Sequence, residues 1–153
     1  KLIVGTPARE ELALVLNRTT TTHVSEVEPV LDAPRLLAHQ QLVRQVAIAD
    51  HVLDYAVRLV LATHPREAFA SSMVTRFVKF GASPRAAQAI VLAAKCLALM
   101  DGRSAASIAD IQSIAAPALR HRLILNFEAQ AQGVTADAVI DNLTATLPQL
   151  QEA

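Results

Sequence analysis

Residues 83–102, SPRAAQAIVLAAKCLALMDG, most constrain what this chain can fold into. Apolar side chains recur there every three or four positions, which is the period of one helix face. Ser83 and Pro84 are typical of a helix start, and Gly102 is typical of the residue just past a helix end. The repeating apolar positions are Ala87, Ile90, Val91, Ala94, Leu97 and Ala98. We therefore predict one long helix at the centre of the fold.

The same period recurs along the chain and predicts an all-α fold, a bundle of about five to six helices. Four glycines, 3% aromatic residues and much alanine and leucine favour close helix packing. Further helices are expected from about Pro7 to Arg18 and through RLLAHQQLVRQV, DHVLDYAVRLVLATH, SIADIQSIAAPALRHRL and TADAVIDNLTATL. The first of these has an apolar face formed by Leu12, Val15 and Leu16, with Ala8. The buried side expected in DHVLDYAVRLVLATH consists of Val52, Tyr55, Ala56, Leu59 and Val60. Residues 19–30 lack this period and are expected to form an extended connector, and no element is expected at 66–75. The β-branched run at residues 1–4, KLIV, is expected to be a short strand remnant.

Charge and cysteine content exclude several classes of protein. The 14 basic residues balance 14 acidic ones, so the chain lacks the positive charge that nucleic-acid or anionic-membrane binding requires. Cys96 is the only cysteine, which excludes a disulfide framework and a multi-thiolate metal site within one chain. Charged residues interrupt the apolar windows before a membrane-spanning length is reached. We expect a cytoplasmic protein with no nucleic acid and no membrane among its partners.

Motifs for catalysis or nucleotide binding are missing from the sequence. None of the five histidines has a glutamate or a second histidine at the spacing of a helical zinc site, so no metal site is predicted. Neither the phosphate loop G-x-x-x-x-G-K-[ST] nor G-x-G-x-x-G occurs. By itself, this chain is expected to hold no nucleotide.

Arg85 is the residue whose position needs an explanation. It lies in the first turn of the long predicted helix, where the helix dipole makes a cation slightly unfavourable, so an anionic partner is a reasonable expectation. Arg120 and Arg122 lie at a predicted helix end, where cations complement the exposed carbonyl groups. A second interpretation of these two arginines is contact with a nucleotide or a neighbouring subunit. Arg103, beyond the end of the long helix, is expected to be a solvated charge.

Four stretches in this order carry a family resemblance: KLIVGTPAREELALVL, EVEPVLDAPRLLAHQQLVRQVAIADHVLDYAVRLVLATH, GASPRAAQAIVLAAKCLALMDGR and DIQSIAAPALRHRLIL. Together they resemble the carboxy-terminal lid, or sensor 2 domain, of MoxR-type AAA+ ATPases. The most specific elements are GASPRA, AAKCLALMDGR and LRHRL at the matching distance. The resemblance implies that Arg85 is the sensor 2 residue, which reaches the γ-phosphate of ATP held by a core domain. It places Ser83 and Pro84 beside the cofactor, with Arg120 and Arg122 as weaker candidates.

The resemblance also implies a domain layout. Residues 1–4 would end the last strand of the AAA+ core, and residues 5–153 would form the helical lid. Within the lid, residues 5–34 would be a first helix and connector, and residues 35–153 the main bundle. The phosphate loop, the magnesium-binding strand and the arginine finger of such a core are absent here, so the chain is expected to be a fragment. ATP and Mg²⁺ would be used by the full-length ATP hydrolase, and this fragment alone would be inactive.

The expected function is to couple ATP binding and hydrolysis to chaperone-like remodelling or maturation of protein complexes. Partners implied by the resemblance are the core domain of the same chain, neighbouring subunits of a hexameric ring and a von Willebrand factor A-type protein. One alternative is a helical protein–protein interaction domain without a nucleotide role. A helix-turn-helix DNA-binding domain is a further alternative, against which the zero net charge argues.

Overall fold

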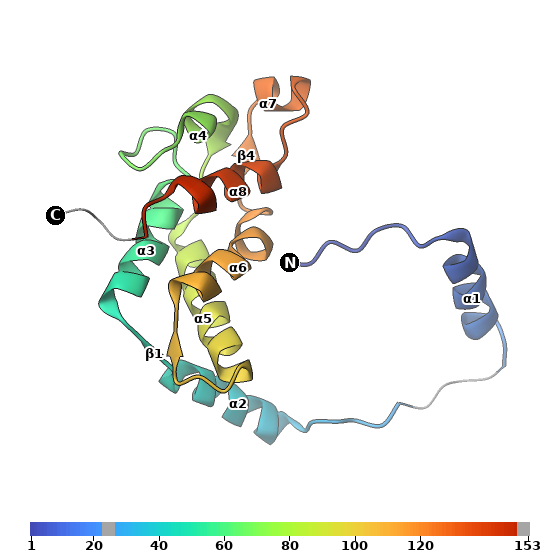
Figure 1. The fold of residues 1–153 in the computed structure, drawn as a ribbon. Helices are drawn as coiled ribbons and strands as arrows, with labels where there is room; N and C mark the ends of the chain where they lie inside the picture. Colours follow the sequence, from blue (N-terminus) through green and yellow to red (C-terminus); the bar gives the residue numbers. More distant parts are fainter. Residues whose placement is uncertain (23–26, 150–153) are drawn as a thin grey trace.

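The structure is a computed structural model that describes residues 1–22 and 27–149, so residues 23–26 of the expected connector lie outside the described residues. Within these ranges the chain is mainly helical, which confirms the predicted all-α class (Figure 1). The helices are α1 (Arg9–Thr19), α2 (Ala33–Gln45), α3 (Asp50–Leu61), α4 (Ser72–Phe77), α5 (Pro84–Met100), α6 (Ile108–Leu119), α7 (Phe127–Ala131) and α8 (Ala136–Thr146). The strands are β1 (Ala47–Ile48), β2 (Val78–Phe80), β3 (Ala105–Ala106) and β4 (Ile124–Leu125).

Helix α5 is the centre of the bundle, as its sequence predicts. It packs most extensively against α6 and also contacts α2 and α3 (Figure 1). Its buried residues are Ala86, Ile90, Ala94 and Ala98. Three of these four are alanines, and such small side chains let the axes of neighbouring helices approach closely. Ile90, Ala94 and Ala98 are buried as predicted, and Ala86 is buried as well. The other three predicted positions, Ala87, Val91 and Leu97, are only partly buried.

Helix α3 confirms its predicted buried face and adds a cation to it. Val52, Tyr55, Ala56, Leu59 and Val60 are buried as expected. Arg58 is also buried, because its guanidinium donates hydrogen bonds to the Asp54 carboxylate at 2.7 Å and to the carbonyl of Pro148 at 2.7 Å. Burying a guanidinium requires such partners. The bond to Asp54 lies within α3, and the bond to Pro148 fastens the segment that follows α8 onto α3.

Two helices were missed by the sequence prediction because they are too short to show a period. Helix α4 begins at Ser72, inside the segment where no element was expected, and the Ser71 hydroxyl caps it by accepting a hydrogen bond from the Val74 amide at 3.3 Å. Helix α7 follows β4 and has Asn126 as its N-cap. Segments of five or six residues present too few turns for an apolar stripe to be recognised.

The four strands are short links between helices. β1 pairs with β3 in parallel, and β2 pairs with β4 antiparallel. The first pair joins the turn before α3 to the turn before α6, and the second joins the segments before α5 and α7. Residues 1–4 form no strand in the structure and are exposed, because a strand requires a hydrogen-bonded neighbour and the described chain provides none there. The strand remnant expected at the N-terminus is therefore not formed.

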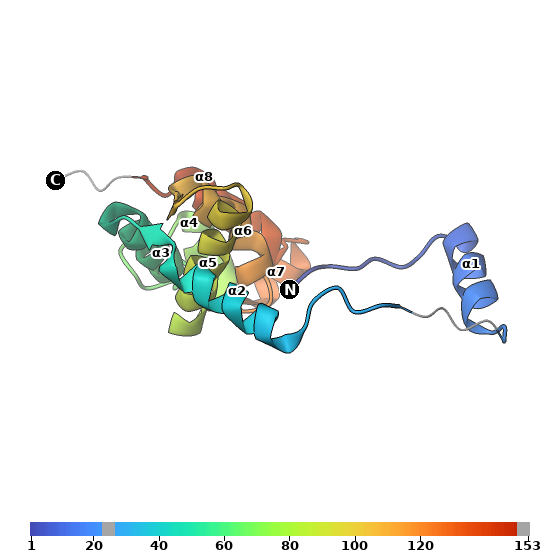
Figure 2. The ribbon, with the colours of Figure 1, turned by 90° about the horizontal axis from the view of Figure 1, so that it is seen from below.

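Helix α1 lies apart from the bundle (Figures 1 and 2). None of its residues is buried, although Leu12, Val15 and Leu16 form the apolar face that the sequence predicts. These three side chains are 48%, 48% and 52% exposed. A periodic sequence can form a helix without burying its apolar face. Helix α1 is such a case, because the described chain offers that face no partner.

An ion pair joins the end of α5 to the start of α6. Arg103 donates hydrogen bonds from both terminal nitrogens to the two carboxylate oxygens of Asp110, at 2.8 and 2.7 Å, and it also pairs with Asp101. Asp110 is buried and accepts bonds from the backbone amide and the hydroxyl of Ser107, each at 2.8 Å. The expectation that Arg103 is merely a solvated charge is wrong, because the turn after α5 carries it onto Asp110. The Arg103 guanidinium holds the pKa of Asp110 well below its ordinary value.

The packing around α5 predicts the effect of enlarging a buried alanine. Ala94 is fully buried, so Ala94→Leu should overpack the bundle and lower the free energy of unfolding by about 1 to 3 kcal/mol. Gln88→Leu, on the exposed side of the same helix, is the matched control and should change stability little. Thermal and urea unfolding of both variants measure the difference. Equal effects would mean that the buried face of α5 is assigned wrongly.

The Arg103–Asp110 pair predicts a loss of stability in acid. The folded-state pKa of Asp110 is lowered, so its contribution to stability is complete above the unfolded-state pKa of about 4 and is lost as the pH falls through the folded-state pKa. At pH 7, Asp110→Asn should lower the free energy of unfolding by on the order of 1–3 kcal/mol, because a charged hydrogen-bonding partner is removed.

Melting curves between pH 7 and pH 3 test this expectation. The difference between wild type and Asp110→Asn should shrink with falling pH, whereas Asp141→Asn on the exposed side of α8 should melt like wild type throughout. A difference between wild type and Asp110→Asn that does not change with pH would contradict the assignment.

Candidate functional site

The start of α5 is held in place by the end of α3. The segment at residues 81–83 leads from β2 into α5, and the side chains of Thr63 and His64 bind the backbone of Ala82 within it. The Ala82 amide donates to the Thr63 hydroxyl at 2.9 Å, and His64 Nε2 lies 3.0 Å from the Ala82 carbonyl oxygen, which can only accept. Thr63 is fully buried and donates its own proton to the Val60 carbonyl at 2.6 Å. Both polar groups of the Ala82 backbone are therefore anchored to the turn that follows α3.

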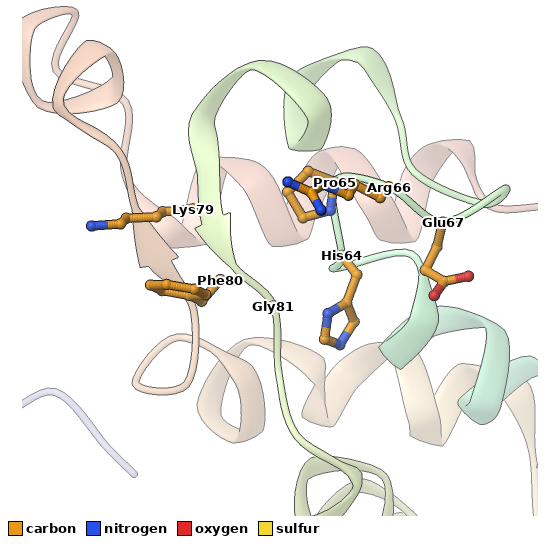
Figure 3. Close-up of a pocket in the computed structure, with 7 residues that line it drawn as sticks. All are labelled: His64, Pro65, Arg66, Glu67, Lys79, Phe80 and Gly81. Atoms are coloured by element: carbon orange, nitrogen blue, oxygen red, sulfur yellow. The ribbon is translucent and has the colours of Figure 1, made fainter.

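Gly81 makes this contact possible because it has no side chain. A Cβ atom at this position would lie 2.7 Å from the carbonyl oxygen of Thr63 and 2.8 Å from Cγ of His64. Both distances are shorter than van der Waals contact, so a larger residue would push the segment away from α3. Figure 3 shows the His64 ring beside the chain that runs from Gly81 toward α5. Close approach of the backbone, rather than an unusual backbone angle, is what requires glycine here.

The three predicted cofactor-binding residues Ser83, Pro84 and Arg85 are consecutive and exposed at the start of α5. Ser83 is the N-cap and Pro84 the first helical residue, as predicted, but the Ser83 hydroxyl makes no capping hydrogen bond. Five other helices of the described chain do have a side-chain oxygen that accepts a hydrogen bond from the first turn. The first turn of α5 also contains no acidic residue. The start of α5 therefore combines the positive end of the helix dipole with the guanidinium of Arg85. This arrangement is suited to binding an anion.

Arg120 and Arg122, the weaker candidates, have partners within the chain. Arg120 Nε donates to the Asp137 carboxylate at 2.8 Å and so joins the end of α6 to the start of α8. Arg122 donates to the Ala118 carbonyl at 2.8 Å, which is the interaction with a helix end that its position predicts. Partial desolvation and the adjacent Arg122 guanidinium lower the pKa of His121. These contacts give both arginines a structural role within the bundle.

A groove of about 300 Å³ runs between α5 and α6 near these cations. Its lining residues are Lys1, Ala89, Ala93, Ile114, Pro117, Ala118, His121 and Arg122. Ala89 follows Arg85 by four residues, so both lie on the same face of α5. Arg122 therefore borders the helix face that carries Arg85.

The hollow drawn in Figure 3 lies beside the segment that precedes α5 and has a volume of about 390 Å³. It is lined by His64, Pro65, Arg66, Glu67, Lys79, Phe80 and Gly81. The cations do not converge on it, since Lys79 extends away from His64 and Arg66 (Figure 3). Lys79 lies instead over the ring of Phe80, 5.5 Å from its centroid. No sequence motif points to this hollow, and its lining forms no recognisable anion site.

The part of the chain that the structure describes shows neither a metal-binding cluster nor a membrane-spanning helix. Residues 1–22 and 27–149 contain no group of three or more histidine, cysteine, aspartate or glutamate side chains placed to hold a metal ion. In the same ranges, no helix has the length and apolar character needed to cross a bilayer.

Comparison with known proteins gives a consistent family. Residues 70–143 match the model of the AAA lid domain. The chain is 34% identical to the chaperone MoxR1 of Mycobacterium tuberculosis, over 98% of this chain and 40% of that protein. It is 30% identical to protein MoxR of Paracoccus denitrificans, over 67% of this chain and 30% of that protein. The chain spans less than half the length of these curated relatives.

A solved structure shares the fold. It is the crystal structure of a proposed ATPase from Cytophaga hutchinsonii, which superposes with a TM-score of 0.82 at 24% sequence identity. The similarity covers 97% of this chain and 45% of that one. At this level of identity, the likeness establishes the common fold.

Proposed function

The chain belongs to the AAA lid family through residues 70–143 and is homologous to MoxR chaperones over most of its length, and from this premise we propose that it is the nucleotide-sensing lid of a MoxR-type AAA+ ATPase. Its task is to couple ATP binding and hydrolysis to chaperone-like remodelling or maturation of protein complexes. The proposal depends on one observation above all, the exposed position of Arg85 at the start of the long helix that forms the centre of the bundle.

The chemistry of this helix end supports a phosphate partner. Backbone amides of a first helical turn point along the axis toward solvent, and the helix dipole favours negative charge there. Ser83 does not use its hydroxyl to cap these amides, and no carboxylate in the first turn competes with an incoming anion. Arg85 adds a delocalised cation that can donate two parallel hydrogen bonds to phosphate oxygens. Stabilising charge on the γ-phosphate as the transition state forms is the role we assign to Arg85.

The remaining domain assignments follow from the same proposal. Residues 1–4 have no strand partner within the described part of this chain, and in the full-length protein they would pair with the core domain as the end of its last strand. Residues 5–34 form a first helix and connector, and residues 35–153 form the main lid bundle. The exposed apolar face of α1 suits contact with that core. The core holds ATP and Mg²⁺, with Ser83 and Pro84 close to the nucleotide. Arg120 and Arg122 come second as nucleotide contacts, because each already has a partner within the bundle.

We further propose that the ATPase is cytoplasmic and works as a hexameric ring in which neighbouring subunits and a von Willebrand factor A-type protein are partners. The balanced charge of the chain agrees with protein partners rather than nucleic acid.

One prediction of this proposal concerns the chain alone. Because it contains neither a phosphate loop nor the magnesium-binding residues of a core, residues 1–153 should hydrolyse no ATP and bind it only feebly, while unfolding in a cooperative and mainly helical transition. A coupled ATPase assay, isothermal titration with Mg–ATP and circular dichroism measure these properties. The same lid joined to its core is the positive control. Turnover by the pure isolated chain would contradict the lid assignment.

Another prediction of this proposal concerns Arg85. In the ATPase that joins this lid to its core, Arg85→Ala should lower ATP turnover by roughly one to three orders of magnitude, as expected for the loss of one preorganised charge-stabilising donor. The melting temperature of the isolated lid should stay the same or rise slightly, because a cation leaves the positive end of a helix dipole. Steady-state ATPase rates and melting curves are the measurements.

Arg35→Ala is the matched control for this experiment. Arg35 follows Pro34 in the first turn of α2, as Arg85 follows Pro84 in the first turn of α5. Both arginines are exposed to solvent. Turnover should be almost unchanged in Arg35→Ala. Wild-type turnover in Arg85→Ala, or an equal loss in both variants, would favour the alternative of a helical interaction domain without a nucleotide role.

A further inference from the structure

We propose that Thr63 and His64, at the end of α3, are positioning residues that hold Arg85 in the geometry required for ATP hydrolysis. This inference rests on the proposed function, since it assumes that Arg85 acts on the nucleotide. Neither residue belongs to the start of α5, and no sequence motif singles either out. Their role follows from what they bind, the two backbone polar groups of Ala82.

The chain between this anchor and Arg85 has little freedom. Ser83 is extended, and the proline ring of Pro84 restricts its own backbone angle. The Ala86 amide donates to the Ser83 carbonyl at 2.8 Å, and Ala86 is fully buried in the bundle. Arg85 is therefore fastened on both sides, by the anchored Ala82 before it and by the buried Ala86 after it. Movement of Ala82 would be transmitted to Arg85 rather than absorbed by a flexible linker.

The anchor itself is built to be rigid. Thr63 is fully buried and uses its hydroxyl twice, as acceptor for the Ala82 amide and as donor to the Val60 carbonyl. A methyl group in place of this hydroxyl would leave the buried Ala82 amide without its partner, which favours displacement of the segment. Gly81 allows the contact, because any side chain there would collide with Thr63 and His64. The turn that follows α3 thus sets where α5 begins.

A displacement of this kind matters because phosphoryl-transfer catalysis depends on exact placement of charge. A shift of about 1 Å in a catalytic group can cost on the order of a hundredfold in rate. The side chain of Arg85 is long, but the position of its guanidinium depends on the position of its backbone, which Thr63 and His64 determine through Ala82. Loss of either anchor should therefore reduce the rate of hydrolysis through Arg85, with the rest of the bundle still folded.

The test uses the ATPase that carries this lid together with its core. Thr63→Val keeps the shape of the side chain and removes the hydroxyl, and should lower kcat roughly ten- to hundredfold with a smaller change in KM for ATP. Thr63→Ser keeps the hydroxyl and should restore most of the rate. His64→Ala should lower kcat in the same way, whereas His64→Gln, which retains a donor for the Ala82 carbonyl, should recover part of it.

Combination with Arg85→Ala separates a positioning role from a general structural one. If Thr63 and His64 act through Arg85, then Thr63→Val or His64→Ala should cause little further loss of turnover once Arg85 is already alanine. The same additional loss in both backgrounds would overturn the inference and leave the proposed function intact. Wild-type turnover in Arg85→Ala alone would remove the proposed function and this inference with it.

Melting curves of every variant show whether the bundle remains folded at the assay temperature. Should Thr63→Val unfold because the residue is fully buried, the His64 variants decide the question, since His64 is only partly buried. Equal rates in His64→Ala and wild type would then overturn the inference for His64, and an unfolded Thr63→Ser would overturn it for Thr63.

Discussion

The close approach of Gly81 to the end of α3 is the contact on which the arrangement of this chain depends. It lets the Ala82 backbone reach the Thr63 hydroxyl and the His64 ring, and so joins two helices that are about twenty residues apart in sequence. A buried hydrogen bond of this kind contributes little net energy when made but is costly to lose. Its main effect is therefore geometrical: the start of α5 has one position relative to α3.

Alanine packing then propagates this position through the bundle. Helix α5 buries Ala86, Ala94 and Ala98 against neighbours that include α3 and α6. These small side chains let the helices pack closely, which leaves α5 little room to shift. At the far end of α5, the Arg103–Asp110 pair joins the helix to the start of α6. One end of α5 is thus held by hydrogen bonds to the Ala82 backbone and the other by an ion pair, and both leave the exposed face free.

The end that carries Arg85 is stabilised less well than it could be. A capping hydroxyl bond or an acidic residue in the first turn would favour the helix, and α5 has neither at this place. Sites that bind ligands commonly retain such unfavourable features, because groups already satisfied within the protein have nothing to offer a partner. A rigid bundle that presents an unsatisfied positive end suits a domain that responds to phosphate, which is how we interpret this chain.

The sequence by itself determined the helical class, the long central helix with its Ser83–Pro84 start, most of the buried face of α5 and the buried face of α3, because a 3.6-residue period and capping residues are local signals. The GASPRA motif also pointed to Arg85 and to the family. Only the tertiary structure decided the partners of Arg103, Arg120 and Arg58, the lack of a strand at residues 1–4, and the anchoring of Ala82 by Thr63 and His64. The physical reason is distance along the chain: an ion pair, a strand pairing or a backbone contact between remote segments leaves no periodic trace in either segment.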